Sequence, residues 1–472
     1  MSSSKMAESL EKLDPQEAWK PAPSDGWNLK WAAHLYRRAA LGAPPPSNSA
    51  AGSWNLLQQA VRRGREAAVE ALLAGGEGQE PFNRLVDEMG QRIAASEDQV
   101  EKLQGWWLYR MLYTPHPLLE RCTLFWHNHF ATSVAKVRSL PLMYGQNQLL
   151  RRHAVGSFRT LLEEIGRDPA MLVWLDANSN VKGSANENYA REVMELFSLG
   201  VGNYTERDIQ EAARALTGSG VRGGRYEFRP DQHDDGPKTI LGHTGRFAGD
   251  DVARILLEQP SAPRFLARKL FRQFISETDS PPDRLIQPLA YQLAASDYDL
   301  RRCLGTILRS RLFYSEHAYR RRVKSPVQYV VGLLRTFDAR VSVESLAGSM
   351  RDLGQSLFAP PNVKGWDGGR AWINSATLLA RHNLAWRLVG GQDRQFKDRL
   401  KIDALVQASA GADGVKQVDF LLKLLLQGDV EPGQRQKLIE FVEAEDTKKL
   451  NAQQRIRQLT HAILLIPAFQ LA

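Results

Sequence analysis

The sequence from Pro117 to Phe130 reads PLLERCTLFWHNHF, and its hydrophobic spacing predicts an amphipathic helix. Pro115 and Pro117 end the preceding helical stretch and begin this one. At about 100° per residue, one apolar arc of this helix contains Leu118, Leu119, Cys122, Phe125, Trp126 and Phe130. A helix with such a face packs against other elements, so this stretch predicts a buried helix in a helical fold.

The two histidines of this stretch are the first candidates for chemistry. His129 falls within the apolar arc, whereas His127 falls outside it. While the helix holds, they point about 160° apart; on an extended segment they would share a face. His129 is therefore either a satisfied core residue or a buried base whose tautomer a carboxylate holds. On the functional interpretation, His129 is catalytic and His127 is a metal ligand.

Helical spacing continues along most of the chain. The pattern predicts helices at about 54–113, 141–153, 157–165, 187–199, 206–217 and 249–339. No alternation of strands with helices is present, which argues against a doubly wound sheet or a barrel. We therefore expect an all-α fold, a large multi-helix assembly.

Four segments are predicted from composition and punctuation. Residues 1–27 are polar and proline-containing and predict a flexible N-terminal arm, and residues 28–218 predict a helical domain with the candidate site. Residues 219–248 are rich in Gly, Pro, Asp and His and predict a loop-rich insertion carrying a small β-hairpin. Residues 249–472 predict a C-terminal helical region packed on the first. The proline-rich stretch 42–52 predicts a linker.

The predicted helix at 187–199 carries an unusual number of polar groups. Ser184 and Glu187 fit a capping box, and Gly200 fits a C-terminal stop. On a regular helix Asn188, Glu192 and Glu195 share an arc of about 40°. Two carboxylates at that spacing can act as acid and base or bind a cation, although a solvated face is the alternative. The functional interpretation assigns catalysis to Glu192 and Glu195, substrate binding to Asn188 and Arg191, and metal binding to Glu187.

The insertion contains a third cluster. His233, Asp234 and Lys238 lie between glycines and prolines, and no phosphate-binding loop motif is present. The functional interpretation makes His233 catalytic, Asp234 a metal ligand and Lys238 a substrate-binding residue, against a plain polar loop. The tryptophans Trp366 and Trp372 could stack on a sugar ring, or they could form a hydrophobic plug. A set of basic and amide residues could form an anion site; it comprises Lys136, Gln146, Asn147, Arg151 and Arg152.

Charge and composition narrow the partners. The formal net charge of +9 favours an anionic small molecule or glycan, unless the basic surface has no special partner. Nucleic acid is not favoured, because the charge is diffuse and no recognition motif accompanies it. Two cysteines exclude a disulfide framework. No apolar run reaches the roughly 18 residues that cross a bilayer, so no membrane role is expected.

Several motifs resemble the large bacterial family of domain of unknown function 1800. The similarity runs from about residue 30 to the end of the chain, and its motifs occur in order: Trp126–Thr132, Arg167–Leu172, Asn186–Glu192, Glu195–Phe197, Gly200–Thr205, Ala212–Gly218, His233–Asp234, Lys238–Thr239 and Pro361–Trp366. The family has no settled reaction, so the resemblance implies a fold and not a chemistry. Its members are commonly encoded beside proteins that resemble alkaline phosphatases and sulfatases, which implies such a partner. Many members carry export signals; this chain shows none, so a cytoplasmic location, or export together with a partner, is expected.

Two functional hypotheses follow. The first is an enzyme whose His, Glu and Asp side chains converge, with a divalent metal or by acid–base chemistry, on an anionic or glycan-like substrate. The second is a non-catalytic helical scaffold that binds a phosphatase- or sulfatase-like partner, with the polar clusters as structural networks.

Overall fold

The computed structural model describes residues 9–42, 52–75, 80–96, 99–396 and 399–472. The start of the predicted arm, residues 1–8, and the proline-rich stretch 43–51 lie outside the described residues. Helices account for most of the described chain, and the few strands form two small sheets. The all-α expectation is therefore confirmed.

The helices of the first part of the chain are η1 (Leu10–Lys12), α1 (Pro15–Trp19), α2 (Leu29–Ala40), α3 (Ser53–Arg63), α4 (Arg65–Leu73), α5 (Glu80–Ser96), α6 (Val100–Tyr113), α7 (Pro117–His129), α8 (Val134–Val137), α9 (Leu140–Arg152), α10 (Phe158–Ile165), α11 (Pro169–Trp174), η2 (Ala177–Ser179), α12 (Asn188–Glu192), the π-helix η3 (Val193–Ser198) and α13 (Glu206–Ala215).

After the insertion the helices are α14 (Gly249–Glu258), α15 (Ser261–Phe274), α16 (Asp283–Ala295), α17 (Leu300–Arg309), α18 (Pro326–Thr336), α19 (Val343–Asp352), η5 (Gly369–Trp372), α20 (Ser375–Val389), α21 (Ile402–Ala410), α22 (Gly414–Leu426), α23 (Pro432–Glu443), α24 (Glu445–Lys448), α25 (Ala452–Leu464) and η6 (Pro467–Gln470).

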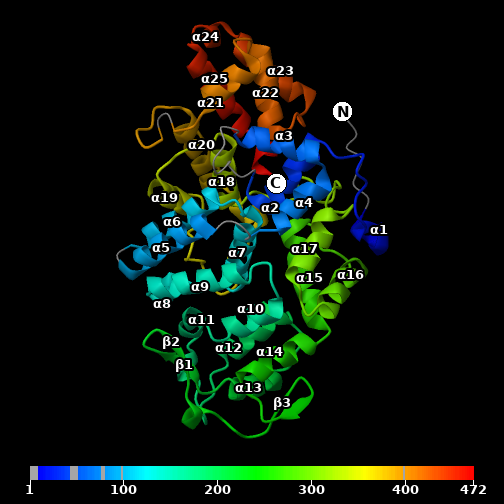
Figure 1. The fold of residues 1–472 in the computed structure, drawn as a ribbon, viewed down its shortest axis with the longest axis vertical. Helices are drawn as coiled ribbons and strands as arrows, with labels where there is room; N and C mark the ends of the chain where they lie inside the picture. The colour runs from blue at the N-terminus through cyan, green and yellow to red at the C-terminus, as the bar shows by residue number, and fades with distance from the viewer. Residues whose placement is uncertain (1–8, 43–51, 76–79, 97–98, 397–398) are drawn as a thin grey trace.

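Two hydrophobic clusters hold the helices together. One takes buried residues from α4, α7 and α10 to α17, and the other takes them from α3, α6, α18 to α23 and α25. Trp27, Tyr36 and Trp174 pack against both clusters. Figure 1 shows the result, with α21 to α25 at one end of the long axis, α12, α13 and the strands at the other, and α7 near the centre. Each cluster uses residues from both sides of the insertion; the predicted domain boundaries stay a prediction.

The insertion contains two hairpins where a single one was expected. Strands β1 (Ser219–Arg222) and β2 (Arg225–Phe228) pair antiparallel, and so do β3 (Lys238–Ile240) and β4 (His243–Gly245). The short η4 (Pro230–Gln232) separates them. Both turns place two consecutive residues at positive φ, Gly223–Gly224 and Leu241–Gly242, which is the geometry of a two-residue hairpin turn. Each strand of the insertion therefore pairs with its neighbour in the chain.

The described part of the predicted arm is packed against the helices. Trp19 is buried and its indole nitrogen donates to the backbone oxygen of Leu285, 2.7 Å away. Pro21 forms a β-bridge with Ser310. The arm therefore does not extend loosely from residue 9 onward, because the apolar face of α1 lies on α16 and α17.

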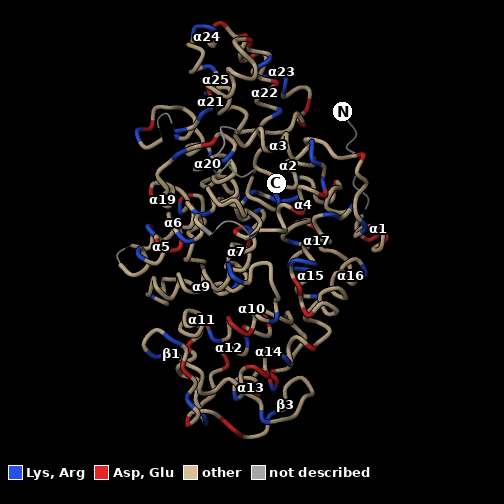
Figure 2. Tube along the Cα trace, in the orientation of Figure 1, with Lys and Arg blue, Asp and Glu red and all other residues tan. Residues whose placement is uncertain are grey.

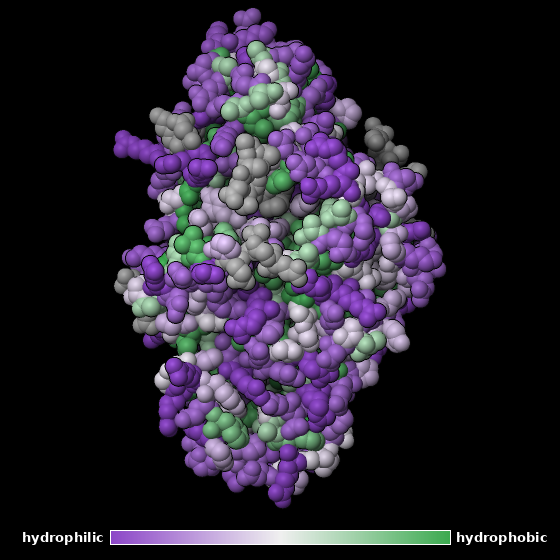
Figure 3. Space-filling model, viewed as in Figure 1, coloured by the Kyte–Doolittle hydropathy of each residue, from purple (hydrophilic) through white to green (hydrophobic). Residues whose placement is uncertain are grey.

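Charges are spread over the whole molecule. Figure 2 shows Lys and Arg interspersed with Asp and Glu along the trace, and Figure 3 shows hydrophilic residues over much of the visible face. Among the described helices, none combines the length and apolar character of a bilayer-crossing segment.

Candidate functional site

Helix α7 directs its two histidines to different parts of the molecule. The helix is regular through His129, so the condition under which His127 and His129 could share a metal ion is not met. His127 is buried between the rings of Trp107 and Trp366, and its Nε2 accepts a hydrogen bond from the backbone nitrogen of Phe358, 3.2 Å away. Burial lowers the pKa of His127 to about 3, so it is a neutral core residue.

His129 lines a cavity of about 390 Å³ and keeps one ring nitrogen without a hydrogen-bond partner. Its Nε2 lies 3.1 Å from the backbone oxygen of Phe197, and a carbonyl oxygen can only accept, so Nε2 carries the proton. The tautomer is thus held by a backbone carbonyl, not by the expected carboxylate. Its Nδ1 is a buried acceptor without a partner. Burial lowers the pKa of His129 well below its usual value, with a smaller effect from Lys269.

The acidic helix does not keep its expected geometry. The regular helix α12 spans only Asn188–Glu192, and the chain widens into the π-helix η3 at Val193. Its start also differs, because Glu187 precedes the helix without a capping hydrogen bond. A π-helix advances fewer degrees per residue, so the predicted common arc does not apply. Such widened turns are frequent at functional sites.

Three residues predicted on this helix lie at the surface. Arg191 pairs with Glu187 at 3.0 Å and with Glu206 at 2.7 Å. The Asn188 side chain donates to Asp176 across 3.4 Å. These contacts are local, so substrate binding by Asn188 and Arg191 and metal binding by Glu187 gain no support from the geometry.

Of the two carboxyls predicted to be catalytic, Glu195 lies at this cavity, whereas Glu192 is not among its lining residues. Glu195 lines the cavity wall, and its Oε2 accepts a hydrogen bond from the Tyr204 hydroxyl at 2.8 Å. Glu192 is half-buried, and its pKa is raised by burial and then by the charge of Glu195, with Lys364 acting in the opposite direction. The two carboxyls therefore differ in environment.

The third predicted cluster forms a separate network in the insertion. The Nδ1 of His233 lies 2.9 Å from the backbone oxygen of Thr217, and Asp234 pairs with Arg214 at 2.8 Å. The Lys238 amine donates to the backbone oxygens of Asp234 and Gly236. None of His233, Asp234 and Lys238 lines the cavity. Their expected convergence with His129 and Glu192 gains no support from the geometry, because His233 and Asp234 contact Thr217 and Arg214 at the end of α13.

The predicted metal ligands do not come together. His127 packs among aromatic rings, Glu187 pairs with Arg191, and Asp234 pairs with Arg214. Within the ranges that the structure describes, no group of three His, Cys, Asp or Glu side chains is placed to hold a metal ion. The predicted set of His127, Glu187 and Asp234 is thus not a ligand set.

The basic set around α9 is also dispersed. Arg151 pairs with the buried Glu120 at 2.6 Å, and Lys136 pairs with Asp176 at 2.8 Å. Gln146 donates to Asp168 across 2.7 Å. These groups stabilise separate parts of the fold, so the expected anion site does not form there.

A cavity of about 390 Å³ lies where α7, η3, α15 and residues 363–372 meet. Its charged lining consists of Arg121, Lys269, Arg272, Arg322 and Lys364, with Glu195, Glu277 and Asp367. Of the cations, Arg322 pairs with Glu277 at 3.1 Å. The other four have no ion-pair partner among the described residues. The lining therefore carries five cations and three carboxylates, which is an excess of positive charge.

Two of these cations are unusually placed. Arg121 is 3% exposed; its Nε donates to the backbone oxygen of Arg38 across 3.2 Å, and its Nη2 has no partner. Burial lowers the pKa of Arg121 to about 9. The ammonium of Lys269 lies over the Phe265 ring, 5.1 Å from its centroid, and burial followed by the charge of Arg272 lowers its pKa to about 8.

The loop with the two tryptophans is fastened to α7 by Asn128. Its Oδ1 accepts from the backbone nitrogen of Trp366 at 2.7 Å, and its Nδ2 donates to the backbone oxygen of Trp366 at 3.3 Å. Gly365 has φ +80°, and a Cβ there would lie 2.3 Å from the Asn128 Oδ1. Trp366 and Trp372, both nearly buried, consequently form part of the cavity wall.

Comparison with known proteins identifies the family. The model of the family described as Protein of unknown function (DUF1800) matches residues 34–471. The chain belongs to this family. No curated protein and no solved structure matches it.

Among the motifs that suggested this DUF1800 membership, the end of α7, Glu195 and the loop at 361–366 meet at the cavity. Sequence reasoning missed Arg121 and Lys269, because a basic residue on an amphipathic helix is usually a surface charge. A weak signal existed for Lys364, which lies inside one of the motifs.

Proposed function

We propose that this protein is an enzyme that binds an anionic, glycan-like molecule in the cavity between α7, η3, α15 and the tryptophan loop. The observation that carries the proposal is the group of four cations, Arg121, Lys269, Arg272 and Lys364, that face one cavity without carboxylate partners. Gathering like charges in a partly dry space is unfavourable unless an anion compensates them. A phosphate, sulfate or carboxylate group supplies that compensation.

The ligand must also donate a hydrogen bond to the neutral imidazole of His129. The unpaired Nδ1 of His129 requires a donor, and the unpaired Nη2 of Arg121 requires an acceptor. A molecule with an anionic oxygen and a nearby hydroxyl meets both requirements. Trp366 and Trp372 add flat apolar surface of the kind on which sugar rings pack. A phosphorylated or sulfated sugar therefore fits the lining best.

Proton transfer is the chemistry that the acidic side of the cavity can supply. Glu192 does not line the cavity, but burial and the charge of Glu195 raise its pKa, so Glu192 exchanges its proton with Glu195 and not directly with the ligand. Glu195 contacts the cavity and is the acceptor. A mechanism of this kind uses the different environments of two neighbouring carboxyls.

Thermal unfolding with matched sugars tests the binding. Glucose 6-phosphate should raise the melting temperature, because a ligand that binds only the folded state stabilises it, whereas glucose at the same concentration and ionic strength should not. Lys269→Met should abolish most of the shift. Lys437→Met, which removes an exposed lysine of α23, is the matched control and should respond like the wild type.

Two further variants separate the roles of the lining residues. His129→Phe keeps an aromatic ring but removes the acceptor nitrogen, so glucose 6-phosphate should lose its advantage over inorganic sulfate. Glu195→Gln removes a negative charge from the cavity, so it should bind glucose 6-phosphate at least as tightly as the wild type. Equal shifts for glucose and glucose 6-phosphate in the wild type would contradict an anion site.

A scaffold that binds a phosphatase- or sulfatase-like protein is the second candidate. Leu378 and Leu379 are neighbouring, exposed residues of α20, at 47% and 59%. Exposed apolar pairs of this kind are common at protein interfaces. Co-purification with the product of a neighbouring phosphatase-like gene, lost in Leu379→Lys, would support this candidate; retention of the partner by that variant would exclude this surface.

A further inference from the structure

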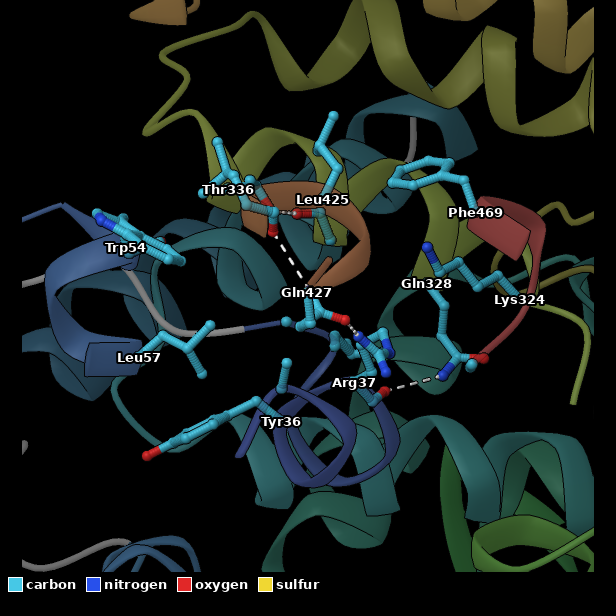
Figure 4. A pocket seen from close by; sticks show the side chains of 17 residues that line it. Tyr36, Arg37, Trp54, Leu57, Lys324, Gln328, Thr336, Leu425, Gln427 and Phe469 are labelled. Atoms are coloured by element: carbon cyan, nitrogen blue, oxygen red, sulfur yellow. Dashed lines mark hydrogen bonds between the residues drawn. The ribbon is translucent and has the colours of Figure 1, made fainter. Parts of the chain in front are cut away.

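A second, smaller cavity lies between α2, α3, α18 and α22, and it shares no lining residue with the first. Its volume is about 80 Å³. Figure 4 shows Trp54 and Leu57 on one side and Lys324 and Arg37 on the other. Ordinary ligand pockets are several times larger, so this space suits a molecule of only a few heavy atoms.

Lys324 is a buried lysine of this cavity with no compensating acid. It is 7% exposed, and its ammonium nitrogen lies 3.7 Å from the centroid of the Phe469 ring. No carboxylate of the described residues pairs with it. Its backbone is held on both sides, since its nitrogen donates to Gln470 at 2.8 Å and its oxygen accepts from Arg381 at 2.7 Å.

The electrostatic surroundings of Lys324 favour the neutral amine. Burial, then the charges of Arg37, Arg381 and Arg320, lower its pKa well below the usual value. An exposed lysine, with a pKa of about 10.4, has only about one amine in a thousand neutral at pH 7.4. Lys324 therefore keeps a nucleophilic lone pair under conditions where exposed lysines do not.

The Arg37 guanidinium leaves part of its hydrogen-bond donors without a partner. Its Nη1 donates to the side chain of Gln427, whereas Nε and Nη2 are buried without a hydrogen-bond partner. Asp429 lies nearby, but its carboxylate pairs with Lys30 at 3.7 Å and Arg320 at 3.6 Å. The guanidinium therefore has donors available for a planar acceptor such as a carboxylate.

We propose that this cavity binds a small 2-oxo carboxylate, with Arg37 holding the carboxylate and Lys324 condensing with the carbonyl. The juxtaposed guanidinium and amine match the adjacent carboxylate and carbonyl of such a molecule. The Lys324 nitrogen attacks the carbonyl carbon and forms a C–N bond. The carbonyl oxygen then leaves as water, taking both amine protons, and a C=N bond remains. No oxidant or second reactant is required.

Reductive trapping tests the proposal directly. The intact protein is incubated at pH 7.4 with pyruvate and cyanoborohydride, and the modified lysines are located by peptide mass spectrometry. Lys324 should be modified at least about tenfold faster than exposed lysines such as Lys437, because its amine is neutral. Modification of Lys324 at or below the rate of Lys437, or of Lys269 in its place, would overturn the proposal.

A second arm tests Arg37 by comparing pyruvate with acetone, which has the carbonyl but no carboxylate. Wild-type Lys324 should prefer pyruvate, and Arg37→Gln should remove that preference while acetone still reacts. An unchanged preference would show that Arg37 does not hold the carboxylate. Lys269→Met should trap pyruvate at Lys324 like the wild type, so failure of the anion site and failure of this site are distinguishable.

Discussion

Glu120 and Arg121 are adjacent in α7 and both are buried, but their surroundings differ. Glu120 accepts hydrogen bonds from Arg110, Arg151 and Trp107 at 2.6–3.1 Å. Arg121 makes one hydrogen bond, to the backbone of Arg38, and leaves Nη2 without a partner. The fully hydrogen-bonded carboxylate of Glu120 stabilises the fold, whereas the guanidinium of Arg121 borders the cavity and is available to a ligand.

The variant Glu120→Gln tests whether the buried carboxylate of Glu120 stabilises the fold. Removing Glu120 leaves the buried Arg151 without an ion-pair partner among the described residues and leaves Arg110 with Asp87 alone, which costs about 3–5 kcal/mol. The free energy of unfolding in urea should fall by that amount. Glu206→Gln, at an exposed pair with Arg191, is the matched control and should cost less than about 1 kcal/mol.

The same residue predicts a pH dependence. Burial alone would raise the pKa of Glu120, but Arg151 and Arg110 outweigh it and lower the pKa to about 2. A carboxyl with a lowered folded pKa stabilises the protein above its ordinary pKa and loses that effect as the pH falls toward the folded value. The stability difference between wild type and Glu120→Gln should therefore be largest near pH 7 and shrink between about pH 5 and 2. A constant difference, measured by urea unfolding, would contradict this assignment.

Part of the site could be predicted from the sequence. Helical periodicity correctly separated His127 from His129, because α7 stays regular to its last turn. It could not show that a backbone carbonyl of η3 would hold the His129 tautomer, since that contact joins residues 68 positions apart.

Among the elements, α7 and the loop at 363–372 contribute the most residues to the cavity wall, and η3 adds Glu195 and Leu196. Helix α13 begins with a capping box, in which Thr205 and Asp208 make both reciprocal hydrogen bonds. The π-helix was not recognisable, because its apolar residues suit an ordinary helix equally well. Its wider turn brings Glu195 to the cavity wall and leaves Asn188 and Glu187 outside.

Gly365→Ala tests whether docking of the tryptophan loop shapes the anion site. The new methyl group would meet the Asn128 backbone oxygen at 2.4 Å as well as its side chain, at a positive φ. The loop must then shift, and we expect a loss of at least about 1 kcal/mol together with a smaller thermal shift by glucose 6-phosphate. Circular dichroism should show unchanged helix content; a full ligand response in this variant would contradict the role of the loop.

Gly348 lies on α19, and its replacement by alanine should stabilise the protein, in contrast to Gly365→Ala. No atom lies within 4 Å of the added Cβ, and Gly348 is exposed in the middle of the helix. Alanine should stabilise the protein by about 0.5–1 kcal/mol, because glycine has the larger backbone entropy in the unfolded chain. Thermal unfolding without ligand measures the change, and destabilisation would argue against a regular α19.

In the whole molecule, the cavity is assembled from segments far apart in the chain. Residues of α7, η3, α15 and the 363–372 loop meet because the two hydrophobic clusters draw both halves of the chain together. Composition and periodicity predicted the all-α class and the loop-rich insertion. Composition and periodicity could not show which polar cluster lines the cavity, because His233 and Asp234 look as ligand-like in sequence as His129 and Glu195.

The shared clusters predict the behaviour of a fragment. Residues 28–218 include α6, whose apolar face packs on α18 and α19. Expressed alone, this fragment would expose that face, so it should be insoluble or lack a cooperative thermal transition. A soluble fragment with a sharp transition would show that the predicted N-terminal domain folds independently.

On the proposed function, cations without carboxylate partners make the cavity beside α7 an anion site. A crystal structure of the protein grown with selenate, whose selenium is located by anomalous scattering, tests it most directly. The selenate should occupy the cavity, with its oxygens within hydrogen-bond distance of Arg121 and Lys269. Selenate found only at exposed surface arginines or lysines, with this cavity empty, would contradict the account.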